Sequence, residues 1–232
     1  MTGTTTPDTP EDGSVPSSTA HPRGKGRQSR ATGEITRARV LRSAVNCILE
    51  EGYYQTSSND IARRAGVTWG ALQYQFGRRE ILLLEVLRAS WQELHEHIRS
   101  ARITGATLEE RLESLLELLA THYAHPDHLA ELQILLDLSH DPSTSDTAKE
   151  AIALHGAELN RLWQPLFEQV LGDAATDQET TRYVFVTARG YLTGNLIASS
   201  ISPTTDDALQ RHMLINGMAS AVRQRQKVMR RP

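Results

Sequence analysis

The stretch TSSNDIARRAGVTWGALQYQFGRRE, residues 56–80, has the pattern of two short helices joined by a tight turn. The run from Ser57 to Asp60 offers four side chains that can cap the start of the first helix. Gly66 suits the left-handed position where a helix ends, because it has no Cβ to clash. Thr68 can then cap a second helix, whose outward residues are polar or aromatic. The stretch therefore predicts a helix-turn-helix whose second helix enters a DNA major groove.

The second helix is expected to divide into an anchoring face and a reading face. Leu72 and Phe76 stand four residues apart and should hold the helix on the core of its domain. Trp69, Gln73 and Gln75 point elsewhere and are the expected readers of base edges. A glutamine can bond adenine through both atoms of its amide, which discriminates bases by about 1–3 kcal/mol.

The pattern D-I-A-x-x-A-G-V-T-x-G-x-L-x-Y-x-F-x-x-[RK]-E resembles the DNA-binding signature of the tetracycline-repressor (TetR) family of ligand-responsive transcriptional regulators. The match runs from about Arg37 to Leu84. It departs from the family pattern at Gln73, where the family usually has a tyrosine, and Tyr74 follows. The resemblance implies a DNA-binding regulator, most often a repressor, that is not an enzyme and needs no cofactor or metal. It also implies that Gly70 lets the backbone approach the duplex and that phosphates are held by Thr56, Ser57, Thr68, Tyr74 and Arg79.

Charge is divided unevenly along the chain, although the formal net charge is only −3. Residues 21–79 carry eleven basic and four acidic side chains, whereas residues 80–232 carry fourteen basic and twenty-one acidic ones. A basic module on an acidic body is expected when only one end meets phosphate.

The composition is that of a cytoplasmic protein with a sizeable core, since 39% of its residues are apolar. No stretch approaches the roughly 18–20 apolar residues of a membrane helix, and the start of the chain lacks the apolar region of a secretory signal.

Three segments are expected. Residues 1–33 are rich in Thr, Pro, Ser and Gly and predict a disordered arm with a basic end, which either contacts DNA or only solubilises the chain. Residues 34–79 are expected to form the helix-turn-helix domain, and residues 80–232 an effector-binding and dimerisation domain. Apolar periodicity and the absence of strand alternation predict an all-α fold of about nine helices.

Two helices near the end of the chain are expected to form a dimer interface. Small residues recur every four positions, and a regulator of palindromic DNA needs a second copy to read both half-sites. In the family, the last two helices pair across a two-fold axis into a four-helix bundle. Packing inside one subunit is the open alternative for this stripe, which comprises Gly190, Gly194, Ala198, Met213, Gly217 and Ala221.

The resemblance further implies a pocket for a small-molecule effector between residues 80 and 190. The aromatic or polar-tipped residues expected to line it, for each of which core packing is the alternative, are Trp91, Tyr123, His155, Trp163, Phe167, Tyr183 and Arg189.

A metal-binding helical protein or metalloenzyme is the alternative class. His122, His125 and His128 follow one another at three-residue steps, which suggests a ligand set. Pro126 interrupts the helix between them, however, and no neighbouring carboxylate or cysteine completes a familiar pattern.

Overall fold

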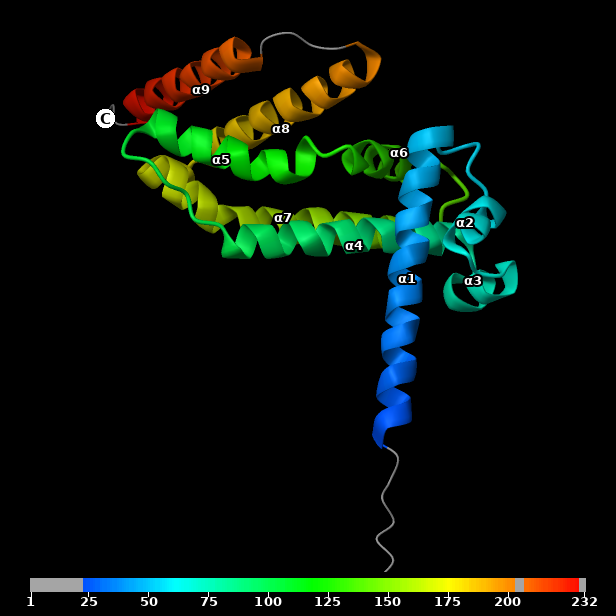
Figure 1. Cartoon of the computed structure of the whole chain (residues 1–232). Helices are drawn as coiled ribbons and strands as arrows, with labels where there is room; N and C mark the ends of the chain where they lie inside the picture. The colour runs from blue at the N-terminus through cyan, green and yellow to red at the C-terminus, as the bar shows by residue number, and fades with distance from the viewer. Residues whose placement is uncertain (1–22, 203–206, 230–232) are drawn as a thin grey trace, which may run out of the picture.

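The computed structural model describes residues 23–202 and 207–229, and within these ranges every regular element is helical (Figure 1). The expected all-α fold of about nine helices is confirmed for this part of the chain. A short 3-10 helix, which the sequence did not predict, follows the seventh helix. The elements are α1 Arg23–Glu51, α2 Ser58–Ala65, α3 Trp69–Phe76, α4 Arg79–Ser100, α5 Leu108–Tyr123, α6 Asp127–His140, α7 Asp146–Leu171, η1 Gly172–Thr176, α8 Gln178–Ile201 and α9 Asp207–Met229.

Helix α1 begins at Arg23, eleven residues before the start expected at Glu34. The later start was expected because residues 1–33 are rich in Thr, Pro, Ser and Gly. The helix nevertheless includes residues 23–33 and projects as a long rod from the rest of the molecule (Figure 1). Residues 1–22, which make up most of the expected disordered arm, lie outside the described residues.

Helix α4 belongs to two hydrophobic cores. Its first half supplies Leu82, Leu83 and Leu87 to a core shared with α1, α2 and α3. Its second half supplies Leu94 and Ile98 to a separate core shared with α5, α7, α8 and α9. One continuous helix therefore joins the helix-turn-helix to the body.

Helix α6 packs on the helix-turn-helix side of this division. Its buried residues Ala130, Ile134 and Leu138 join the first core, where α6 lies against α1 and α4. The core of the small domain, expected to end at Arg79, thus extends into two helices of the expected effector domain.

The other end of the molecule is formed by α8 and α9. Figure 1 shows them side by side at the end opposite α2 and α3, with α5 beneath them. None of the helices in the described ranges is long and apolar enough to cross a bilayer.

The burial of α3 predicts how substitutions on its two faces affect stability. Leu72 is buried, so Leu72→Ala should lower the free energy of unfolding by about 2–5 kcal/mol through lost burial and an unfilled cavity. Tyr74 lies on the opposite, exposed face, and Tyr74→Ala should change it by no more than about 0.5 kcal/mol. Chemical denaturation of both variants measures the difference. Equal losses in the two variants would contradict the packing described for α3.

Candidate nucleic-acid interface

Helix α2 begins with a reciprocal cap. The backbone N–H of Asp60 donates to Oγ of Ser57 at 3.2 Å, and the backbone N–H of Ser57 donates to the Asp60 carboxylate at 3.3 Å. This capping box satisfies two N–H groups that the first turn would leave without partners. The cap residue is Ser57, one of the four candidates in the run from Ser57 to Asp60.

The turn between α2 and α3 is set by Gly66. Its φ of 64° and ψ of 35° are left-handed, as expected for a glycine at a helix end. The N–H of Val67 donates to the carbonyl of Ala62 at 3.0 Å, which closes the end of α2. Thr68 follows in extended conformation and accepts from the N–H of Ala71 at 3.1 Å, so it caps α3 as predicted.

Helix α3 has one buried and one exposed face. Leu72 and Phe76 are buried in the first core, as expected for the anchoring residues. Trp69 is 54% exposed and Tyr74 is 95% exposed, although both are large aromatic side chains. The remaining expected contact residues of the turn and of α3, Thr68, Gly70, Gln73 and Gln75, are also exposed, as is Ser57 before α2.

Two residues expected at the DNA backbone have places inside the domain instead. Thr56 is buried, and its hydroxyl donates to the carbonyl of Gly52 at 2.9 Å. Arg79 is half-buried, with its guanidinium 4.3 Å from the ring centroid of Tyr53 and 2.7 Å from the Tyr53 carbonyl oxygen. Thr56 is thus bonded within the loop before α2, and Arg79 ties that loop to the start of α4.

Other basic residues lie around α3 and differ in their exposure and in their ion pairs. Arg78 is exposed immediately before α4. Arg63 is exposed and pairs with Asp60 at 2.7 Å. Arg64 pairs with Glu50 on α1, and hydrogen bonding to Arg64 lowers the pKa of Glu50. Arg78 is therefore more exposed than Arg79, the neighbouring arginine that the sequence analysis expected at a phosphate.

The seven expected effector-pocket residues fall into three groups. Tyr123, Trp163 and Phe167 are buried together in the second core, where Phe185 joins them with ring centroids 5.3–6.4 Å away. Burial raises the pKa of Tyr123 to about 12. Arg189 lies over this group, 5.6 Å from the ring centroid of Phe185.

Trp91 and His155 form the second group, apart from the first. Their rings stack at 3.7 Å with an angle of 2° between them. They line a cavity of about 710 Å³ between α4 and α7, together with His95 and Glu158. Burial is the largest cause that lowers the pKa of His155 to about 4, so its ring is neutral at pH 7. Tyr183, the seventh residue, is exposed on α8.

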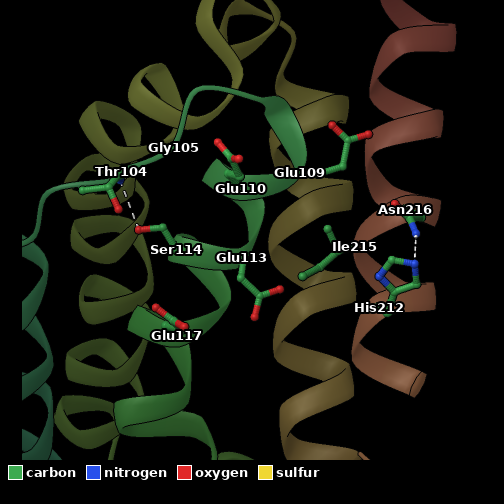
Figure 2. A pocket seen from close by; sticks show the side chains of 10 residues that line it. All are labelled: Thr104, Gly105, Glu109, Glu110, Glu113, Ser114, Glu117, His212, Ile215 and Asn216. Atoms are coloured by element: carbon green, nitrogen blue, oxygen red, sulfur yellow. Dashed lines mark hydrogen bonds between the residues drawn. The ribbon is translucent and has the colours of Figure 1, made fainter. Parts of the chain in front are cut away.

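A groove of about 480 Å³ between α5 and α9 is lined by four glutamates of α5, Glu109, Glu110, Glu113 and Glu117. Figure 2 shows Glu113 and Glu117 of α5 on one side and His212 and Asn216 of α9 on the other. Arginines already engage these carboxylates: Arg211 pairs with Glu113 and with Glu117. These ion pairs link α5 to α9 along the groove.

The three histidines of the alternative class do not act as one set. His125 is exposed, and its Nδ1 lies 3.7 Å from the Asp127 carboxylate. His122 and His128 instead converge on Glu131, a carboxylate that linear spacing did not reveal as a partner.

These features define a helix-turn-helix regulator with an exposed reading helix. Residues 40–86 match the family model described as bacterial regulatory proteins, tetR family. The HTH-type transcriptional regulator LmrA of Bacillus subtilis (strain 168) is 20% identical over 165 residues, which cover 71% of this chain and 86% of that protein.

Two solved structures share the fold. The TetR-family transcriptional regulator SCO4454 of Streptomyces coelicolor aligns with a TM-score of 0.59 and 17% identity, covering 82% of this chain and 95% of that one. FadR of Bacillus subtilis, solved in complex with stearoyl-CoA, aligns with a TM-score of 0.54 and 16% identity, covering 80% and 96%. The match to the tetR family of bacterial regulatory proteins thus covers the helix-turn-helix and the start of α4.

The cap of α3 can be tested separately from DNA binding. Thr68→Ala removes the oxygen that accepts from the Ala71 N–H and should lower the free energy of unfolding by about 1 kcal/mol. Thr68→Ser keeps that oxygen and should retain nearly all of the stability. Denaturant titration of both variants measures the effect, and a loss as large in the serine variant would rule out the cap as its source.

Proposed function

We propose that the chain is a ligand-responsive repressor that binds palindromic operator DNA as a homodimer and is released by a small-molecule effector. The observation that carries this proposal is the exposed face of α3, on which Trp69, Gln73, Tyr74 and Gln75 all lie. As a bacterial DNA-binding regulator, the protein acts in the cytoplasm.

In this proposal α3 lies in the major groove, and its residues divide between bases and phosphates. Trp69, Gln73 and Gln75 contact base edges, with Gly70 allowing close approach. Ser57, Thr68 and Tyr74 contact phosphates. Arg78 takes the phosphate contact first expected of Arg79, because Arg78 is exposed whereas Arg79 is held against Tyr53.

The dimer uses the outer faces of α8 and α9. On α8, apolar side chains and glycines form one exposed stripe at three- and four-residue steps, made of Tyr183, Val186, Gly190, Gly194, Ile197 and Ile201. On α9, Leu209 and Met213 are exposed. They share one face of the helix with Gly217 and Ala221, because the four residues follow one another at four-residue steps. A Cβ added at Gly190, Gly194 or Gly217 would meet nothing within 4 Å, so packing inside the subunit does not require these glycines. Close crossing of these helices with those of a second copy would require small residues at these positions. Ala198, another small residue of the expected interface, also lies on α8.

The effector changes the spacing between the two α3 helices of the dimer. To release DNA, it must bind more tightly to the conformation whose reading helices are not spaced by about 34–36 Å. The cavity between α4 and α7 is the best-supported place for it, because it contains the stacked pair Trp91 and His155 and borders the helix that reaches both cores. Tyr123, Trp163 and Phe167 form the core beside it.

The proposed contacts between α3 and base edges predict how Gln73→Ala changes DNA affinity. A sequence selected from random DNA by the parent protein supplies the operator. Loss of a two-bond contact to adenine should weaken binding to that operator by about 5–150-fold, which corresponds to 1–3 kcal/mol. Binding to unrelated DNA should stay the same, because phosphate contacts dominate it. Titration of fluorescent duplexes measures both affinities.

Gln164→Ala, which truncates an exposed glutamine of α7, is the matched control and should bind the operator as the parent does. Arg78→Ala should weaken binding to both duplexes and reduce the salt dependence by about one phosphate contact. Failure to select any sequence, or unchanged operator affinity in Gln73→Ala, would contradict the placement of α3.

The dimer assignment predicts the effect of a charge in the stripe. Met213 is 65% exposed in the single chain, so Met213→Glu should fold normally but place a carboxylate in the interface. Sedimentation should show monomers, and operator affinity should fall by on the order of 100-fold because the second half-site no longer adds to binding. Leu154→Glu, on the exposed face of α7, is the control and should stay dimeric. A dimeric Met213→Glu variant would place the interface elsewhere.

A further inference from the structure

Two imidazoles and a carboxylate converge where α5 passes into α6. His122 lies in the last turn of α5, and His128 and Glu131 lie in the first turns of α6. Nε2 of His122 is 3.3 Å from Oε2 of Glu131, and Nδ1 of His128 is 3.2 Å from the same oxygen. All three candidate ligand atoms lie within 4.8 Å of one another. The short connection at Pro126 brings the ends of the two helices together and makes this convergence possible.

The separations match those of a metal-ion site. Zinc binds imidazole nitrogen at about 2.0–2.1 Å and carboxylate oxygen at about 2.0–2.2 Å, so two ligands of a tetrahedral ion lie about 3.3–3.5 Å apart. Both nitrogen–oxygen separations are close to that spacing already. After small side-chain rotations, a divalent ion therefore fits in place of the protons that lie between Glu131 and the two imidazoles.

The carboxylate of Glu131 is buried and is held in place by a third residue. A buried anion is stable only when it is paired or bound to a metal. The hydroxyl of Ser90 on α4 donates to the other carboxylate oxygen and so orients the group from behind.

The three residues face a cleft that leaves room for the remaining ligands of an ion. The cleft has a volume of about 670 Å³ and is lined by α1, by α4 and by the α5–α6 connection. Water or a small anion entering the cleft can supply a fourth ligand. The wall contributed by α1 includes Arg42, which pairs with Asp127 at the start of α6. The site therefore lies beside a direct contact between the helix-turn-helix domain and the body.

We propose that His122, His128 and Glu131 form a binding site for a divalent transition-metal ion, such as zinc, between α5 and α6. Mixed imidazole and carboxylate ligands select zinc, cobalt, nickel or iron over magnesium and calcium, which prefer oxygen. An ion bound here fixes the end of α5 to the start of α6. Helix α6 in turn packs in the core that it shares with α1, α2 and α3. This site is distinct from the proposed α4–α7 effector cavity, and its existence does not depend on DNA binding.

Cobalt titration of the full-length chain tests the site directly. The protein is treated with a chelator, freed of any affinity tag and titrated with Co²⁺, whose bound form has visible absorption bands that hexahydrated Co²⁺ shows only weakly. We expect strong bands that saturate at one ion per chain, loss of the bands when Zn²⁺ is added, and no effect of an equal concentration of Mg²⁺. Absence of strong bands at micromolar protein, or equal competition by Mg²⁺, would overturn the proposal.

Variants locate the ion. Glu131→Gln preserves the shape of the buried side chain but removes its charge, and His122→Ala changes a less buried member of the set. Each should weaken cobalt binding by at least the roughly 10–100-fold that loss of an outer-shell partner costs. His140→Ala, at the exposed far end of α6, is the matched control and should bind as the parent does.

Circular dichroism checks that each variant keeps its helix content, and the less buried His122 keeps the test decisive if Glu131→Gln does not fold. Parent-like cobalt affinity in a folded Glu131→Gln or His122→Ala variant would place the ion elsewhere and refute the site. Because no DNA is present, failure of the metal site and failure of the repressor proposal give separate results.

Discussion

The division of α4 between two cores is the constraint on which the rest of the structure depends. Leu82, Leu83 and Leu87 are buried with the helix-turn-helix, whereas Leu94 and Ile98 are buried with the body. A close-packed core resists partial deformation. The first half of α4 is therefore packed with α3, and the second half with α5 and α7. In the proposed dimer, any change in the spacing of the two α3 helices must be accommodated along this one helix or at its contacts.

The sequence predicted the local structure well because the determining contacts are only a few residues long. Ser57 and Asp60 cap each other across three positions, and Gly66 ends α2 through its own backbone conformation. Helices α2 and α3, and the exposed face of α3, follow from such short-range rules and from apolar spacing. The resemblance to TetR regulators was recognisable for the same reason, since the signature lies in this region.

The parts that the sequence did not predict depend on contacts between distant segments. Arg78 and Arg79 are equivalent in the sequence, and only the position of Tyr53 twenty-six residues earlier turns one of them inward. The periodic histidines suggested His125 as a ligand, but the turn at Pro126 rotates it outward and brings Glu131 in. The expected pocket residues were chosen by chemistry alone, and three-dimensional packing separates Trp91 and His155 from Tyr123 and Trp163.

The contacts of α4 with α6 and α7 indicate how a signal could reach α3. The start of α7 is tied to the start of α4, because Ser145, the cap residue of α7, donates to the Glu80 carboxylate. Further along, the same two helices border the cavity with Trp91 and His155. A molecule that separates α4 from α7 at the cavity therefore acts on a pair of helices that are joined at the start of α4, next to α3. The cleft with Glu131 lies on another side of α4, between α1 and α6. Ligands at the two places would bias the same helix through different neighbours, so their effects on DNA binding are coupled whenever both are bound.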